Sequence, residues 1–112
     1  CLEDVSIAPN ERVQISTGIA MEIPEKYVGL IWDKSGLSHK SGLKTVGGVV
    51  DSQYRGEIKV GMINLSGDVF KFEAGQKIAQ MLIQKVKQID LIESAELSDT
   101  DRGEGGFGST GK

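Results

Sequence analysis

The sequence predicts a single all-β domain, a sandwich or barrel of short strands. A chain of 112 residues is long enough for one domain and too short for two. Apolar side chains alternate with polar ones along most segments, so the period is two and not the 3.6 of a helix. Turn signals separate these segments, and the 15 glycines suit tight turns that need positive φ angles. Short strands at this spacing are typical of sandwiches and barrels.

Each strand is predicted from apolar side chains at every second position. In chain order, these alternating sets are Val13 and Ile15, then Ile19, Met21 and Ile23, then Val28, Leu30 and Trp32, then Ile58, Val60 and Met62, and finally Phe70 and Phe72. Turn signals such as APNE, IPEK, LSGD and EAGQ lie between the sets. The pattern predicts successive short strands joined by tight turns.

One more strand is predicted over KIAQMLIQKV, where apolar residues fall on both faces, as in a strand buried on both sides. The following QIDLIES predicts another strand, and the only helix expected is a turn or two near SGLSHK. The apolar pattern stops at about Ser98. We therefore expect a barrel over residues 1–97 and a glycine-rich arm over residues 98–112.

Composition narrows the function classes. The formal net charge of −3 does not favour general binding to nucleic acid. No apolar run approaches the length of a membrane span. Cys1 is the only cysteine, which excludes an intrachain disulfide and a cysteine-based metal site and favours the cytoplasm. His39, the only histidine, lies in a polar turn. A metal would then be held by oxygen ligands, which favours magnesium over zinc.

The C-terminal stretch TDRGEGGFGSTGK allows two interpretations. Its composition is typical of a disordered tail, yet Arg102 and Phe107 suit pairing with phosphate and stacking on a flat ring. The residues from Gly106 to Lys112 also match the first seven positions of the G-x-x-x-x-G-K phosphate loop. No helix follows that lysine in the chain, so we reject the nucleotide-triphosphatase loop.

Three internal stretches favour a phosphate site. They are DKSGLSHK, VGGVVDSQYRGE and AGQKIAQML. Each alone has a structural explanation, because Ser-Gly pairs form turns, an Asp near a turn caps it, and a strand Gln bonds to backbone. Together they supply cations, hydroxyls, a carboxylate and an amide for one site.

These stretches and the tail, in this order, resemble the trimeric dUTP pyrophosphatase (dUTPase) family over essentially the whole chain. Its motifs two to five correspond to DKSGLS, GGVVDSQYRG, GQKIAQ and DRGEGGFGST. The resemblance implies a jelly-roll-like β-barrel that forms a homotrimer. It also implies active sites between subunits, each closed by the arm of a neighbour. An extended arm of fifteen residues reaches roughly 50 Å, which permits such a crossing.

The resemblance also implies an activity, the hydrolysis of dUTP to dUMP and pyrophosphate, which limits uracil incorporation into DNA and supplies dUMP. Asp51 is then the general base for the water that attacks the α-phosphorus. Mg²⁺ is implied as cofactor, held mainly through substrate phosphates and water, with no certain protein ligand in this chain. The implied phosphate-binding residues of the barrel are Lys34, Ser35, Gly36 and Gln80.

For the nucleoside, the resemblance implies that a hairpin backbone reads the edge of uracil, while an aromatic ring excludes a 2′-hydroxyl. These residues are Val46, Gly48, Val49, Val50, Lys59 and Tyr54. From the arm, Phe107 is implied to stack on uracil. The implied γ-phosphate clamp consists of Arg102, Gly108, Ser109 and Thr110.

The sequence departs from the family pattern in two ways. Lys34 and Lys77 stand where the family usually has arginine. The positive charge remains, but the bidentate hydrogen bonding of a guanidinium group to phosphate is lost. The motif-one aspartate would fall just before Cys1, so either the chain is trimmed or the residue is absent.

Three alternatives stay open. A non-catalytic dUTPase-fold module that binds nucleotide or a protein is favoured by the missing motif one and opposed by Asp51. A dCTP deaminase on the same fold is opposed by the intact GGVVDSQYRG hairpin. A structural barrel with a disordered tail predicts that the tail has no role in function.

Overall fold

The computed structural model describes residues 1–111, which form eight short strands and one helix. The all-β, jelly-roll-like prediction is confirmed, and Lys112, the last position of the phosphate-loop pattern, lies outside the described residues. The elements are β1 (Val5–Ile7), β2 (Arg12–Ser16), β3 (Tyr27–Trp32), α1 (Ser35–Ser41), β4 (Leu43–Val46), β5 (Val49–Val50), β6 (Lys59–Asn64), β7 (Phe70–Phe72) and β8 (Gln80–Lys85).

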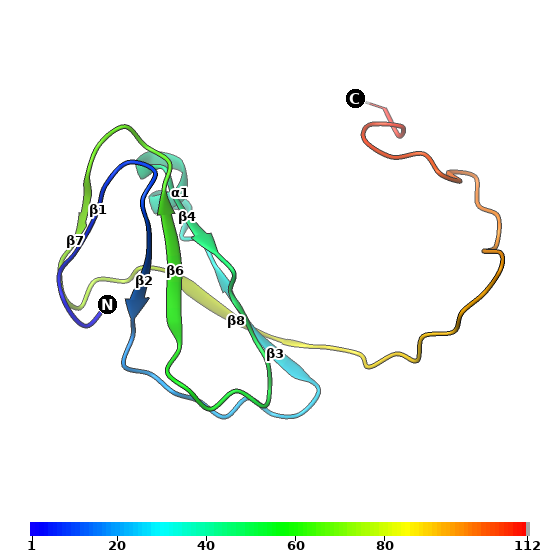
Figure 1. Ribbon diagram of the computed structural model, residues 1–112, viewed down its shortest axis with the longest axis horizontal. Coiled ribbons are helices and arrows are strands. Elements are labelled where there is room, and N and C mark those ends of the chain that lie inside the picture. Colours follow the sequence, from blue (N-terminus) through cyan, green and yellow to red (C-terminus); the bar gives the residue numbers. More distant parts are fainter. Residues whose placement is uncertain (112) are drawn as a thin grey trace.

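The strands form three antiparallel sheets, in the orders β2-β6-β4, β5-β3-β8 and β1-β7. Strands far apart in the sequence pair with each other, since β1 lies beside β7 and β3 beside β8 (Figure 1). Such crossovers between sheets are typical of a jelly roll and not of a simple meander. The helix α1 is the one expected near SGLSHK, and it ends at Gly42 with φ of 66°.

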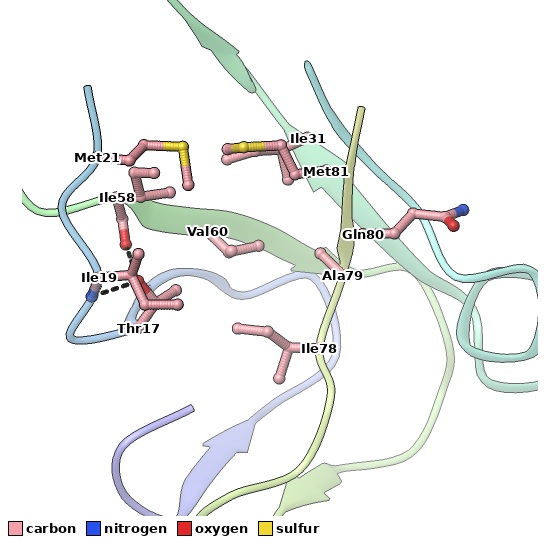
Figure 2. A pocket seen from close by; sticks show the side chains of 10 residues that line it. All are labelled: Thr17, Ile19, Met21, Ile31, Ile58, Val60, Ile78, Ala79, Gln80 and Met81. Carbon is pink, nitrogen blue, oxygen red and sulfur yellow. Dashed lines mark hydrogen bonds between the residues drawn. The ribbon is translucent and has the colours of Figure 1, made fainter. Parts of the chain in front are cut away.

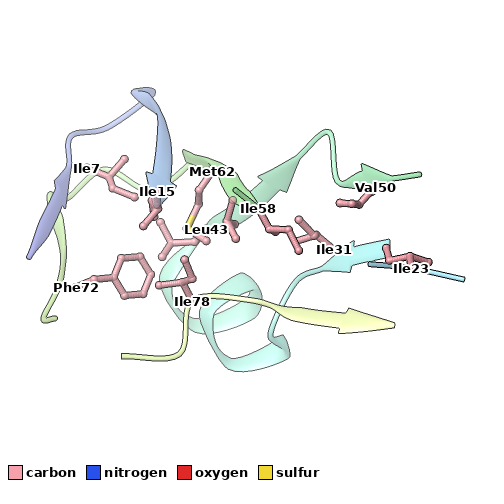
Figure 3. Close-up of a cluster of buried hydrophobic side chains, with 11 residues drawn as sticks. Ile7, Ile15, Ile23, Ile31, Leu43, Val50, Ile58, Met62, Phe72 and Ile78 are labelled. Atoms are coloured by element: carbon pink, nitrogen blue, oxygen red, sulfur yellow. The ribbon is translucent and has the colours of Figure 1, made fainter. Parts of the chain in front are cut away.

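The core lies between the sheets and consists almost wholly of aliphatic side chains (Figure 3). Ile15 faces Val60 across the β2–β6 pair, and Met62 lies two residues further along the same face. Burial of each such side chain stabilises the fold by about 1.5–3 kcal/mol. The alternation in the sequence therefore marks the inward face of β2 and β6 correctly.

The sheet β5-β3-β8 has an apolar outer face. Leu30 on β3 faces Val49 on one side and Leu82 on the other, and Trp32 continues the same face. The expectation that β8 is buried on both sides is wrong for the single chain, because Leu82 and Ile83 are 51% and 52% exposed. Apolar residues on both faces indicate that a strand can be buried on both sides. They do not identify the segment or chain that buries it. We call Leu30, Trp32, Val49 and Leu82 the apolar outer face.

Two predicted strands are absent from residues 1–111. Residues 19–23 form no strand, although Ile23 is buried and the Ile19 carbonyl accepts a hydrogen bond from the Ile58 amide at 2.8 Å. Residues 88–94 also form no strand, and their apolar side chains are exposed. An alternating pattern gives a strand only where a neighbouring strand pairs with it through hydrogen bonds. Within the described chain, neither segment has such a neighbouring strand.

Residues 86–111 contain neither strand nor helix and lead away from the barrel (Figure 1). The radius of gyration is 18.8 Å, whereas a compact domain of this length has about 13 Å. The boundary at residue 97 stays a prediction. No helix in the described part of the chain is long and apolar enough to cross a membrane.

Candidate active site

A cavity of about 370 Å³ lies beside the hairpin in which β4 pairs with β6 and whose long connection contains β5. Six predicted site residues line it together, namely Gly48, Val49, Val50, Asp51, Tyr54 and Lys59. Its other walls are Gln14, Ile31, Glu57 and Ile58. Val46 lies at the end of β4 and does not line this cavity. The fold thus brings together the carboxylate and most of the residues expected around the nucleoside.

The hairpin turns through Gly47 and Gly48, whose φ angles are 72° and 105°. The Ile31 amide donates a hydrogen bond to the Gly48 carbonyl at 2.8 Å. A Cβ at Gly48 would lie 2.9 Å from the Ile31 carbonyl oxygen, so only glycine fits this close approach. The main chain therefore shapes this cavity wall.

The Asp51 carboxylate is held from one side only. Its Oδ1 accepts a hydrogen bond from the Gln53 amide at 2.7 Å, and its Oδ2 has no protein partner among residues 1–111. The side chain is exposed, so the second oxygen is free to bind water. One oxygen fixes the orientation of the carboxylate while the other is available for chemistry.

The Tyr54 ring is fixed by its own turn. Its hydroxyl donates to the Glu57 carbonyl at 2.8 Å, and its ring lies where a side chain at residue 56 would otherwise be. A Cβ at Gly56 would lie 2.6 Å from the Tyr54 hydroxyl oxygen. Arg55 adds a hydrogen bond to the Ser52 carbonyl at 2.8 Å. These contacts give the wall of the cavity one defined shape.

A second cavity, of about 450 Å³, contains the predicted phosphate residues of the barrel. It is lined by Lys34, Ser35, Gly36, Leu37 and Gln80. No side chain caps α1, so the first amides of the helix keep hydrogen-bonding capacity. The Gln80 side-chain amide donates to the Asp33 carbonyl at 2.8 Å, which fixes its direction. Donors and a cation are therefore gathered in one place.

Asp33 joins these elements, and sequence reasoning missed it. Its Oδ1 accepts hydrogen bonds from the Thr45 amide and hydroxyl, both at 2.7 Å, and its Oδ2 pairs with Lys44 Nζ at 2.7 Å. Partial burial opposes ionisation of the carboxyl group. The hydrogen bonds and charge of Lys44 and the two bonds from Thr45 outweigh it, and lower the pKa of Asp33 from 3.8 to about 2.

Asp33 is expected to stabilise the fold in a pH-dependent way. Its pKa is lower in the folded chain, so its contribution is complete above the unfolded value of 3.8 and is lost as the pH falls through about 2. The side chain is 18% exposed, and the shift corresponds to about 2 kcal/mol. Urea unfolding of the wild type and Asp33→Asn should show a stability difference that shrinks by this amount between about pH 6 and about pH 2. A difference that is constant with pH would contradict the assignment.

The predicted arm residues form a third, separate group. Arg102, Phe107, Gly108, Ser109 and Thr110 lie in successive tight turns, with hydrogen bonds such as Ser109 amide to Gly106 carbonyl at 3.2 Å. The Phe107 ring is fully exposed. These residues line neither the hairpin cavity nor the phosphate cavity within the described chain. One chain thus carries three groups of site residues that do not meet.

A third cavity, of about 180 Å³, is an apolar slot between the sheets (Figure 2). Met21 and Met81 face each other across it, with Ile58 and Ile78 on its walls. The side chain of Gln80 points away from the apolar residues. A charged ligand would lose its hydration here without finding partners, so the slot does not suit a nucleotide.

Besides Asp33, the missed residues are Gln14, Gly56 and Glu57. Gln14 and Glu57 occupy positions that look like polar positions of any exposed strand or turn. Asp33 precedes a Ser-Gly turn, which suggests a helix cap, yet the residue at the N-cap position is Lys34. Only the pairing of distant strands reveals these roles.

The comparisons with known proteins agree with this geometry. A model of the dUTPase family matches residues 1–111. The deoxyuridine 5'-triphosphate nucleotidohydrolase of Hydrogenobaculum sp. (strain Y04AAS1) is 50% identical, over 99% of this chain and 79% of the relative. The protein of that name from Nautilia profundicola (strain ATCC BAA-1463 / DSM 18972 / AmH) is also 50% identical, over 99% of this chain and 80% of the relative.

Solved structures give the same result. The dUTPase of Staphylococcus bacteriophage 80alpha with dUpNHpp superposes with a TM-score of 0.90 at 30% identity, over 98% of this chain and 82% of that chain. A mutant dUTPase from phage phi11 of S. aureus, described with a structural Mg(II) ion, has a TM-score of 0.77 at 27% identity, over 84% of this chain and 78% of that chain. With the family model matched over all described residues, the chain belongs to the dUTPase family.

Proposed function

We propose that this chain hydrolyses dUTP to dUMP and pyrophosphate. The observation that carries the proposal is the Asp51 carboxylate, which has one oxygen fixed by Gln53 and the other free. It lines the same cavity as the hairpin residues expected to read uracil. Membership of the dUTPase family supplies the reaction class.

In the proposed reaction, the free oxygen of Asp51 takes a proton from a water molecule. That water attacks the α-phosphorus, a new P–O bond forms, and the bond to the bridging oxygen of pyrophosphate breaks. The electron pair leaves with pyrophosphate, and the proton remains on Asp51 until solvent removes it. The exposure of the Asp51 carboxylate suits this final exchange.

The phosphates bind to the second cavity. Ser35 and Gly36 donate hydrogen bonds to the phosphate oxygens, and Gln80 keeps one amide hydrogen for them because its other one bonds to Asp33. Lys34 adds positive charge beside them. As an ammonium group, Lys34 attracts phosphate without the planar fork of an arginine.

We propose Mg²⁺ as the cofactor, bound to the nucleotide. No group of three or more His, Cys, Asp or Glu side chains in residues 1–111 could hold a metal ion. The side chains described here therefore do not fit a metal site of their own. Phosphate oxygens and water, which Mg²⁺ prefers, would hold it.

The hairpin main chain explains selectivity for uracil. Gly48, Val49 and Val50 present backbone groups to the cavity, with that of Lys59 beside them, and a base with the opposite donor and acceptor order leaves these groups unpaired. The fixed Tyr54 ring packs beneath the deoxyribose and leaves no room for a 2′-hydroxyl. Desolvated, unpaired polar groups make such discrimination strong.

We further propose that each active site is shared between the chains of a homotrimer. Three observations support this: the predicted site residues fall into three groups that do not meet, the sheet β5-β3-β8 has an apolar outer face, and residues 86–111 extend from the barrel. The arm of a neighbour, from about residue 98, brings Arg102, Gly108, Ser109 and Thr110 to the γ-phosphate.

We assign the protein to the cytoplasm.

A pyrophosphate-release assay with dUTP and Mg²⁺ tests the proposed activity. We expect turnover with dUTP and little with dCTP, dTTP or UTP. Tight binding of dUTP with no turnover would instead indicate a non-catalytic module. Release of ammonia from dCTP would indicate a deaminase.

Phe107→Ala is expected to weaken nucleotide binding by about 5- to 150-fold, since stacking on a base contributes about 1–3 kcal/mol. The ring is fully exposed in the single chain, so its loss should leave the melting temperature unchanged. Calorimetric titration with dUpNHpp measures the affinity, and Phe107→Trp serves as the control that keeps a stacking ring. Equal affinity of Phe107→Ala and the wild type would contradict the stacking role.

A further inference from the structure

Asp33 lies between the hairpin and the phosphate cavity and bonds toward both. On the hairpin side, its carboxylate holds Thr45 through two hydrogen bonds of 2.7 Å. Thr45 is 8% exposed and lies on β4, the first strand of the hairpin. Because β4 is the edge strand of the sheet β2-β6-β4, the outward Thr45 amide has no strand to bond to, and Asp33 takes that place.

On the side of the phosphate cavity, Asp33 acts through its main-chain carbonyl group. Its carbonyl oxygen accepts the hydrogen bond from Gln80 Nε2 at 2.8 Å. The next residues along the chain, Lys34 and Ser35, line the phosphate cavity together with Gln80. A movement of Asp33 would therefore shift three phosphate-binding residues at once.

We propose that Asp33 is a positioning residue that holds in place both the hairpin and the phosphate-binding segment of its own chain, which serve two different active sites in the proposed trimer. This inference rests on the proposed function, because it concerns the same two groups of residues. The carboxylate ties β3 to β4, and the carbonyl of the same residue aims Gln80. The direct hydrogen bond from the Ile31 amide to the Gly48 carbonyl is a second tie between the end of β3 and the hairpin.

The ionised state of Asp33 suits this role. The carboxylate is stabilised by Lys44 Nζ and by both donors of Thr45, and its low pKa keeps it ionised in neutral and mildly acidic solution. Lys44 is half-exposed and supplies charge, whereas Thr45 supplies the fixed geometry. An acceptor at this position is therefore needed more than a charge.

Two variants separate these contributions. Asp33→Ala removes every side-chain bond, whereas Asp33→Asn keeps an oxygen that accepts from Thr45 and loses only the ion pair. The control is Phe72→Leu, a core change on β7, whose sheet with β1 lines neither the hairpin cavity nor the phosphate cavity. It lowers stability without touching the proposed link.

The measurements are kcat and KM for dUTP, together with the melting temperature of each variant. We expect Asp33→Ala to lower kcat by about 100-fold, since a misplacement of about 1 Å costs that much. Asp33→Asn should stay within about 5-fold of the wild type, and Phe72→Leu should keep kcat despite a lower melting temperature. The inference is overturned if Asp33→Ala keeps kcat while losing stability, or if Asp33→Asn loses as much kcat as Asp33→Ala.

The affinity for dUpNHpp separates this inference from the proposed function. If the wild type binds this analogue but does not hydrolyse dUTP, the proposed activity fails. The role of Asp33 is then decided by affinity, which Asp33→Ala must lower more than Phe72→Leu does. Equal affinities of these two variants would overturn the inference.

Discussion

Asp51→Asn is expected to lower the kcat for dUTP by about 10²- to 10⁴-fold, which is the contribution of a general base. An amide has nearly the shape of the carboxylate, and its oxygen still accepts the hydrogen bond from the Gln53 amide. The variant therefore keeps the turn but cannot accept the proton from water. Affinity for dUpNHpp should change little, because the remaining walls of the cavity are intact.

The assay is single-turnover pyrophosphate release, with dUpNHpp titration on the same samples. Gln53→Ala is the matched control, since its amide is part of the main chain and survives the change. It should retain most of the activity. If Asp51→Asn kept the wild-type kcat, Asp51 would not be the base, and the mechanism would need another group.

Deletion of the residues after Asp101 is expected to lower kcat/KM for dUTP by about 10²- to 10⁴-fold. Loss of stacking removes about 1–3 kcal/mol, and loss of the charge-assisted bonds of Arg102 removes a similar amount. The barrel should keep its melting temperature, because no arm residue up to Gly111 packs against the core cluster. A change limited to binding and turnover would exclude a tail without a role in function.

Mixing two inactive proteins tests whether the site is shared. One carries Asp51→Asn with an intact arm, and the other has Asp51 but lacks the arm. In randomly mixed trimers, about a quarter of the sites would combine an intact hairpin with an intact arm from another chain. Activity should therefore reappear after the two are unfolded and refolded together. No recovery from well-mixed trimers would place the hairpin and the arm of one site on the same chain.

Alternation of apolar residues predicted β2, β3, β6 and β7, because each has one face toward the core and a partner strand in the same chain. It missed β1, although Val5 and Ile7 alternate as Phe70 and Phe72 do in β7, and it missed β4, where the buried Thr45 is polar. Residues 19–23 and 88–94 show the period but have no strand partner in the described chain. A sequence pattern records which face can be buried, while the partner depends on distant contacts.

The candidate site shows the same limit. Motif residues such as Asp51 and Ser35 were predicted from their chemistry and order, since these are properties of the sequence itself. Their distribution over two cavities depends on how β3 pairs with both β5 and β8. Asp33 could not be predicted, because its partner Thr45 becomes adjacent only after the sheets form.

The separation of the three groups of site residues has a genetic consequence. In the proposed trimer, a chain that is defective in one group of site residues inactivates one of the three active sites. The two other sites stay active. A chain defective in all three groups contributes one faulty part to every site of its trimer. In a cell with equal amounts of intact and defective chains, about one trimer in eight would then consist of intact chains only and keep its active sites. Defects confined to one group should be nearly recessive, whereas combined defects should be dominant.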